Sequence, residues 1–510
     1  MIALGQNSQA IAAPLRISGA WLVLKFGGTS VATAERWGSI EKIIRSQRAT
    51  GMRVLVVCSA LAGVTNRLEA LVADIDRGAP ADAALGTLAE THAALAGALG
   101  VDVDRVLGTE LAALKRRVAE LAARGRSVTP PERALLMAYG ELMSSRLGAE
   151  WLERRLGDVA WLDAREVLRG LDKGERAERY LSARCAATFD ADARRRLDAL
   201  GVPVVVTQGF IARGPEGETV LLGRGGSDAA AAYLGAAVGA SAVELWSDVP
   251  GMFTADPRAV AGARLLQRVS YDEAETFGAL GAKVLHPRAV EPARAAGIPI
   301  RLGWTAQPDV VGTRILGSRQ PRGAKAVVSR RQLALVTMWR RSSWQPVGFM
   351  ADVASRFHAR GLSMDLIASS PSEIRVTVDL AAFPSAASEL DALLGELSQV
   401  CRPRVTQRVA CVSVAGAGVA HALGRTARGA ALFSEVPTYL VSHAPSGGHI
   451  SVIVDDCEAP SLVASLHDKL IAPRRDEATF GPSWSALGGT VAMRVPSGPA
   501  TASSQVEVQP

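Results

Sequence analysis

Short apolar runs that alternate with amphipathic helical stretches organise the chain from residue 21 to residue 315. Five of these runs are predicted to be buried strands: 21–26, 53–60, 202–210, 242–248 and 298–304. A long Ala-, Leu- and Arg-rich stretch from about 67 to 155 is predicted to be helical, with a new helix starting at Pro130-Pro131, because proline is tolerated in a first turn. This alternation predicts an α/β domain whose largely parallel sheet is sandwiched by helices.

A smaller pattern occurs twice in the C-terminal part of the chain. After a polar linker at 316–330, the order strand-helix-strand-strand-helix is predicted for 333–397 and again for 410–470. This order is most of a ferredoxin-like βαββαβ unit, so two such domains are expected. The last residues, 476–510, contain one weak strand candidate at 489–495 and are otherwise predicted to be a largely disordered tail.

Composition excludes several classes of protein. The 510 residues are 48% hydrophobic and 21% charged, which is typical of a folded chain with more than one domain. No run of apolar residues is long enough to span a membrane, and the first 20 residues lack the basic start of a secretory signal. Five widely spaced cysteines argue against a disulfide scaffold and favour the cytoplasm. The net charge of +7 comes from arginines dispersed among acids, which argues against a nucleic-acid partner.

Two glycine-containing loops each follow a predicted strand and precede a helix. In the first, 25–31 (KFGGTSV), the glycines allow backbone N–H groups to approach an anion, and Lys25 can place a positive charge on a phosphate. This loop is not a Walker A motif, and taken alone it is equally compatible with a plain strand-helix turn. In the second, 223–228 (GRGGSD), Arg224 can hold a carboxylate or phosphate, which favours a functional loop.

The start of the helix after the second loop is also predicted. The strongly helical sequence AAAAYLGAAVGA follows the loop directly. Ser227 or Asp228 is expected to cap this helix, because short polar side chains satisfy the free N–H groups of a first turn.

A shaped loop follows the predicted strand at 242–248. Pro-Gly and Asp-Pro pairs fix two turns within 246–258 (WSDVPGMFTADPR), and the loop starts where ligands bind in open α/β sheets. Phe253 can stack on a base, and Arg258 can contact a phosphate. This loop is therefore a candidate nucleotide site.

Three further segments contribute polar groups. Residues 281–288 (GAKVLHPR) supply a second lysine, Lys283, and residues 57–66 (VCSALAGVTN) offer hydroxyl groups on another loop after a strand. Residues 139–145 (YGELMSS) place Glu141 on a helix, where a lone acid is more often solvated.

These six segments, in this order over roughly 20–475, resemble aspartate kinase, of the amino-acid kinase family. The paired small units resemble the ACT domains that bind amino acids and regulate that enzyme. The resemblance implies an amino-acid-kinase-type catalytic domain at 20–318 and ACT-like domains at 331–408 and 409–475. It also implies transfer of phosphate from ATP, with Mg²⁺ carried by the nucleotide, to L-aspartate. The product, 4-phospho-L-aspartate, leads toward lysine, threonine and methionine.

Matching the family's motifs residue by residue implies roles for the site residues. The implied catalytic residues are Lys25 and Asp228. The aspartate pocket would contain Arg224 for the α-carboxylate and Glu141 for the ammonium, lined by Ser59 and Thr65. The implied nucleotide-side residues are Lys25, Phe26, Gly27, Gly28, Ser30, Ser247, Asp248, Phe253, Arg258 and Lys283. No residue is assigned as a metal ligand.

The resemblance further implies an amino-acid effector, lysine or else threonine, in the first ACT-like unit. The implied contacts are Gly348, Phe349, Asp365 and Ser370. Asp365 is expected to receive the effector's ammonium; the alternative is a plain strand-helix turn whose Asp365 faces water. ACT pairing implies a homodimer or tetramer. The sequence does not identify the effector or the oligomer, nor does it show whether the chain is part of a longer bifunctional enzyme.

Some positions depart from the family pattern. Phe253 stands where tyrosine is usual, Ser247 where threonine is common, and Gly303-Trp304 lies where an Asn-Thr pair is frequent. Two other functions are alternatives to this reaction: a non-catalytic amino-acid sensor, and a kinase for glutamate or acetylglutamate. The presence of the charged motif residues disfavours the sensor, and the GELMS motif together with the paired ACT-like units disfavours the other kinases.

Overall fold

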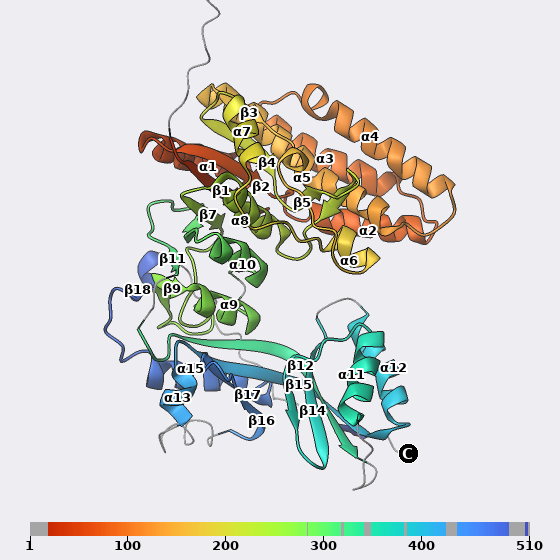
Figure 1. Ribbon diagram of the computed structural model, residues 1–510, viewed down its shortest axis with the longest axis vertical. Helices are drawn as coiled ribbons and strands as arrows, with labels where there is room; N and C mark the ends of the chain where they lie inside the picture. The colour runs from red at the N-terminus through yellow and green to blue at the C-terminus, as the bar shows by residue number, and fades with distance from the viewer. Residues whose placement is uncertain are drawn as a thin grey trace, which may run out of the picture. The chain divides into compact units, whose positions relative to one another are not determined.

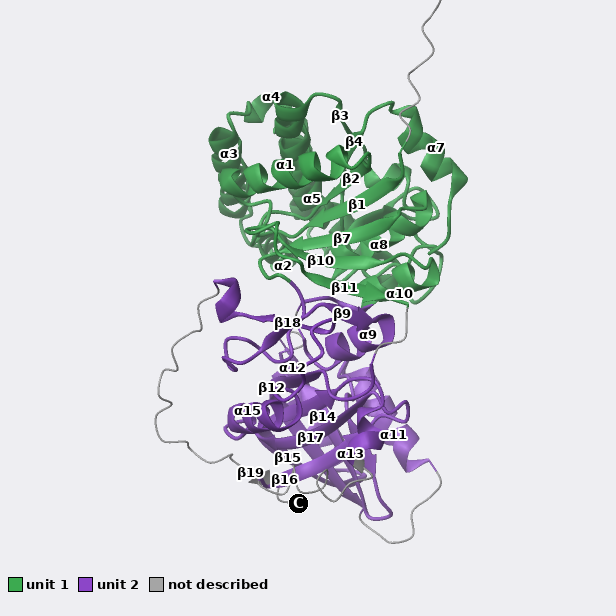
Figure 2. Cartoon of the chain, turned by 90° about the vertical axis from the view of Figure 1, so that its left-hand side faces the viewer, with its two compact units in different colours: residues 1–250, 288–317 green, residues 251–287, 318–510 purple. Residues whose placement is uncertain are grey.

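The computed structural model describes residues 19–282, 284–317, 321–340, 348–381, 385–424, 436–488 and 505–507. The chain forms two compact units, coloured separately in Figure 2. Unit 1 contains Met1–Pro250 and Arg288–Gly317, and unit 2 contains Gly251–Pro287 and Ser318–Pro510. Compactness therefore groups residues 251–287 with the C-terminal part of the chain, whereas the predicted catalytic domain included them. The domain boundaries stay a prediction.

The sheet of unit 1 has β1 (Trp21–Phe26) at its centre. Its strands follow the order β3-β4-β2-β1-β7-β10-β11, and the pairs β1–β2, β1–β7, β2–β4 and β7–β10 are all parallel. The five predicted strands are confirmed as β1, β2 (Arg53–Cys58), β4 (Val204–Gln208), β7 (Ala242–Ser247) and β10 (Ile300–Trp304). The sequence did not predict the short strands β3 (Val159–Trp161), β5 (Ile211–Arg213), β6 (Thr219–Leu221) and β11 (Thr313–Leu316).

Helices accompany this sheet (Figure 1). Their bounds are α1 (Ala34–Ala49), α2 (Val64–Asp76), α3 (Asp82–Leu99), α4 (Val103–Ala123), α5 (Pro130–Leu156), α6 (Arg176–Leu181), α7 (Ala191–Ala199), α8 (Gly226–Val238) and α10 (Pro287–Ala295). The predicted break before Pro130 is confirmed, with Thr129 and Glu132 forming a capping box. No helix of the described residues is long and apolar enough to cross a membrane.

Unit 2 is built on two long antiparallel strands, β12 (Ala326–Arg340) and β15 (Cys401–Ala415). The sheet order is β13-β14-β12-β15-β17-β16, and β19 also pairs with β15. Strands β14, β12, β15, β17 and β16 are labelled in Figure 1. The other strands are β13 (Ile367–Ser369), β14 (Glu373–Asp379), β16 (Thr438–His443), β17 (His449–Asp455) and β19 (Gln505–Glu507). The helices are α11 (Phe349–Ala359), α12 (Ala386–Leu397), α13 (Val419–Gly424) and α15 (Ala459–Leu470).

The two predicted ferredoxin-like units share these long strands. One half of β12 pairs with β14, and the other half, 326–330, pairs with 411–415. The prediction that 316–330 is a linker is therefore wrong for its last five residues. Between the halves, Gln332 and Arg408 have φ angles of 61° and 58°, in the left-handed region, where the pairing shifts register. The helix predicted from about 419 to 435 is described only as α13; its remainder lies outside the described residues.

Residues 251–287 contribute β8 (Arg264–Leu266), β9 (Arg268–Ser270) and α9 (Tyr271–Ala279) to unit 2. Two buried contacts join this segment to the ACT-like part: Lys325 Nζ lies 2.8 Å from Glu273 Oε1, and Thr254 Oγ1 lies 2.9 Å from His467 Nε2. Part of the predicted disordered tail also belongs here, because β18 (Phe480–Ser483) pairs with β8. The strand candidate at 489–495 lies outside the described residues.

Candidate active site

An ion pair joins the two glycine loops that the sequence singled out. Lys25 is the penultimate residue of β1, and its Nζ atom lies 2.5 Å from Oδ1 of Asp228, in the first turn of α8. The predicted capping by Ser227 or Asp228 is wrong: Gly225, at φ 65°, is the N-cap, and no side chain caps the helix. The Asp228 carboxylate is consequently available to hold the Lys25 ammonium.

The loop after β2 lies against the first glycine loop. A Cβ atom added at Gly28 would lie 2.7 Å from the carbonyl oxygen of Ala60, so only glycine allows this approach. Two backbone hydrogen bonds join the loops, from Ser59 N to Phe26 O at 3.2 Å and from Ala62 N to Gly28 O at 3.2 Å. Two motifs that are about 30 residues apart in the sequence thus form one edge of the sheet, as expected for the carboxyl ends of parallel strands.

Glu141 is buried beside this edge. Glu141 lies on α5 and is only 3% exposed, and its Oε2 atom has no hydrogen-bond partner among the described residues. Burial raises the pKa of Glu141 to about 8, although a hydrogen bond from the Ala60 backbone and the charge of Lys25 act in the opposite direction. The sequence pattern alone favoured a solvated acid here, so burial is a correction. An unpaired buried carboxyl oxygen is costly, and the ionised group is suited to receive a cationic ligand group.

The other predicted pocket residues surround these groups to different degrees. Ser59 is buried directly after β2, and its carbonyl oxygen accepts a hydrogen bond of 2.6 Å from Ser144 Oγ on α5. Thr65 is half-buried at the start of α2, and Arg224 is exposed in the loop that precedes α8. The structure therefore brings Lys25, Ser59, Glu141 and Asp228 together, with Thr65 and Arg224 on adjoining segments. The sequence analysis did not assign a role to Ser144, which hydrogen-bonds to Ser59. The position of Ser144 in the GELMS motif could have indicated it.

Several predicted nucleotide-side residues pack against or hydrogen-bond to other residues of unit 1. The Phe26 ring is buried and stacked on Trp246 with 6.4 Å between centroids, so only its backbone can face a ligand. Ser30 is buried, and its Oγ atom lies 2.9 Å from Thr305 Oγ1. Ser247 Oγ donates to Val249 O at 3.1 Å, whereas the neighbouring Asp248 is exposed.

Trp246 also accounts for one departure from the family pattern. A Cβ atom added at Gly303 would lie 2.7 Å from the Trp246 ring. Gly303 therefore makes room on β10 for the large ring on β7, which explains the glycine of the Gly303-Trp304 pair.

The remaining nucleotide-side residues belong to unit 2 or are not described. Phe253 is half-buried, and Arg258 is exposed with its Nε atom 3.1 Å from Asp256 Oδ1. Lys283 lies outside the described residues.

The predicted effector residues lie in the first ACT-like unit. Gly348, at φ 110°, caps the start of α11, and Phe349 is buried in the core beneath it. Asp365 Oδ2 lies 2.8 Å from an Arg330 guanidinium nitrogen on β12, although burial raises the pKa of Asp365. Ser370 Oγ accepts backbone hydrogen bonds from residues 372 and 373. Asp365 thus already has a cationic partner, Arg330.

Comparison with known proteins decides the family. The model of the Amino acid kinase family matches residues 20–303. Lysine-sensitive aspartokinase 3 of Escherichia coli is 33% identical over 88% of this chain and 99% of its own length. The chain belongs to the aspartokinases of the amino acid kinase family.

Solved structures agree with this assignment. E. coli aspartokinase III in complex with lysine and aspartate, in the T-state, has a TM-score of 0.75 at 30% identity, over 88% of this chain and 99% of that chain. The same enzyme with aspartate and ADP, in the R-state, has a TM-score of 0.70 at 31% identity over the same shares. The predicted fold class, an amino-acid-kinase-type sheet followed by two ACT domains, is confirmed.

Proposed function

We propose that the chain transfers the γ-phosphoryl group of MgATP to the side-chain carboxylate of L-aspartate, and that Glu141 receives the substrate's ammonium. The observation that carries this assignment is the buried Glu141 carboxylate, with one oxygen unpaired, near the Lys25–Asp228 pair. An amino-acid substrate supplies the missing partner. Its negatively charged side chain can then face Lys25, and Arg224 holds the α-carboxylate.

The chemistry needs positioning rather than a base. The aspartate side chain has an ordinary pKa of about 4 and is already ionised at neutral pH, so no proton has to be removed before attack. The barrier is the approach of two anions in line, which positive charge and oriented N–H groups lower. Lys25 supplies the charge, Asp228 fixes its ammonium, and Gly28 presents a backbone N–H group. The Gly27 N–H instead donates to the Trp246 carbonyl oxygen at 3.2 Å, so Gly27 contributes by lacking a side chain. Ser59 and Thr65 line the aspartate pocket.

The nucleotide side of the proposal rests on the family motifs. ATP is a substrate, and Mg²⁺ enters as part of MgATP. The residues assigned to this side, besides Lys25 and the two glycines, are Phe26 through its backbone, Ser30, Ser247, Asp248, Phe253, Arg258 and Lys283. A cytoplasmic location and assembly into a homodimer or tetramer through the ACT domains belong to the same proposal.

Trapping the product with hydroxylamine tests the reaction directly, because acyl phosphates react with it to give hydroxamates. Purified protein with MgATP should form hydroxamate with L-aspartate and at least about tenfold less with L-glutamate, since one extra methylene is worth roughly 1–3 kcal/mol in a fitted pocket. Release of ADP without hydroxamate, or a preference for glutamate or acetylglutamate, would contradict the proposal.

Lysine is the proposed effector, bound at Gly348, Phe349, Asp365 and Ser370; threonine is the second choice. Replacing Asp365 with alanine should preserve kcat and raise the lysine concentration for half-inhibition at least about tenfold, equivalent to roughly 1.4 kcal/mol of binding. Asp391→Ala, at an exposed position on α12, is the matched control. Inhibition unchanged in the Asp365 variant would remove this site from the proposal.

A further inference from the structure

A single strand of unit 2 lies between a nucleotide motif and the C-terminal segment. On one edge of β8, the backbone of residues 252–254 is hydrogen-bonded: Leu266 N donates to Met252 O at 2.8 Å, and Thr254 N donates to Arg264 O at 2.9 Å. On the other edge, β18 pairs antiparallel with β8. Residues 480–483 thus belong to the same small sheet as the loop that carries Phe253.

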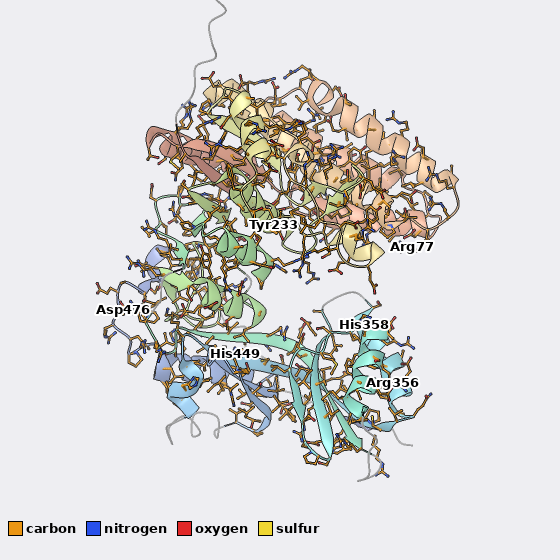
Figure 3. All side chains as sticks on the ribbon, viewed as in Figure 1. Arg77, Tyr233, Arg356, His358, His449 and Asp476 are labelled. Carbon is orange, nitrogen blue, oxygen red and sulfur yellow. The ribbon has the colours of Figure 1, made fainter. Side chains whose placement is uncertain are left out.

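The C-terminal segment 476–488 is firmly attached there. The Arg264 side chain donates to three carbonyl oxygens, those of Arg474, Phe480 and Gly481. Asp476, labelled in Figure 3, closes the turn before β18 by accepting a hydrogen bond of 2.6 Å from Thr479 Oγ1. The Phe480 ring is only 2% exposed and anchors the segment by burial. These contacts fix where the next aromatic residue, Trp484, lies.

Trp484 packs on the nucleotide-motif phenylalanine. Its ring centroid lies 5.7 Å from that of Phe253, with the planes at 85°, an edge-to-face pair. Its backbone N donates to Ala263 O at 3.3 Å, just before β8. Unlike Phe480, both paired residues remain partly exposed, so the pair forms an aromatic surface and not a closed core.

We infer that Trp484 is a nucleotide-binding residue that forms, with Phe253, an aromatic wall for the base of ATP. The inference rests on the proposed function, which assigns Phe253 to the nucleotide. A purine ring stacks favourably on aromatic side chains whatever its hydrogen-bonding pattern. Phe253 lacks the hydroxyl group of the tyrosine usual at this position, and Trp484 enlarges the aromatic surface beside it. The C-terminal segment thereby supplies part of the surface that binds the base.

Replacing Trp484 with alanine should raise the KM for ATP and the Kd for MgADP at least about tenfold, equivalent to about 1.4 kcal/mol. The KM for aspartate should stay within about twofold, and Trp484→Phe should restore most of the ATP affinity. Ser485→Ala, at the exposed next position, is the matched control. A variant that lowers the unfolding temperature but leaves both KM values unchanged would show that Trp484 only supports the fold, and would overturn the inference.

Photolabelling gives a readout of contact itself. An ADP analogue with an azide on the base should label the peptide that contains residues 480–488, and excess MgADP should suppress this labelling. Labelling confined to other peptides would contradict a base contact. Nucleotide binding and labelling are measured without aspartate, so they test Trp484 even if no hydroxamate forms; absence of hydroxamate alone would count against the proposed function only.

Discussion

Replacing Lys25 with alanine is expected to lower kcat for aspartate phosphorylation by about 10²–10³-fold, the usual loss for one preorganised contact to a transition state. Two effects combine in this variant. The charge facing the transferred phosphoryl group disappears, and Asp228 loses the ammonium 2.5 Å away, so an uncompensated negative charge remains beside two anionic substrates. Because the loss occurs mainly in the transition state, kcat should fall far more than either KM rises.

Steady-state kinetics on the purified variant measures this loss. Lys42→Ala is the matched control, because Lys42 is exposed on α1. Both purified variants should remain folded, which thermal unfolding measures. Near-normal kcat in the Lys25 variant would remove this residue from the catalytic machinery.

Replacing Glu141 with glutamine is expected to raise the KM for aspartate by about 10²-fold, because truncating one partner of a buried charged pair typically costs about 2–5 kcal/mol. The KM for ATP should change little. Glu150→Gln provides the control on the same helix, where Glu150 pairs with Arg154. Loss of ATP affinity with unchanged aspartate affinity would show that Glu141 does not face the amino-acid substrate.

The raised pKa of Glu141 also predicts a pH dependence of stability. Its folded-state pKa of about 8 lies above the ordinary value of 4.5, so between these values the ligand-free folded chain holds a proton that the unfolded chain has lost. The contribution of Glu141 to the free energy of unfolding therefore falls as pH rises from about 5 to 8. In Glu141→Gln this contribution is absent, so urea unfolding of the two proteins across this pH range measures it.

Local patterns sufficed for much of the fold, and they also supplied the candidate site residues, whose roles stay a prediction. Buried parallel strands are continuous apolar runs, which is why β1, β2, β4, β7 and β10 could be predicted. The motifs contain Lys25 and Asp228 but did not predict their ion pair. Asp228 is available to Lys25 because Gly225 is the N-cap of α8, and that cap depends on a backbone conformation that the sequence does not show. Burial of Glu141 was not predictable, since a single acid on a helix has the same local signature on a solvated face.

The hydrophobic periodicity of a segment does not predict which distant segment it pairs with. Residues 326–330 form a strand because 411–415 lie beside them, and nothing within the segment itself signals that partner. The C-terminal segment was predicted to be disordered because Pro- and Gly-containing sequence lacks a strand period. It is ordered through the Arg264 side chain and the edge of β8, contacts that span more than 200 residues.

Calorimetry of aspartate binding tests the central claim, that the Glu141 carboxylate receives the substrate's ammonium. With a pKa of about 8 in the ligand-free protein, Glu141 is mostly protonated at pH 7 and must ionise when the ammonium binds. Titrations at pH 7 in buffers of different ionisation enthalpy should reveal release of close to one proton for each aspartate bound. Glu141→Gln should bind more weakly and release none. Tight binding without proton release, or equal release by the glutamine variant, would contradict the account.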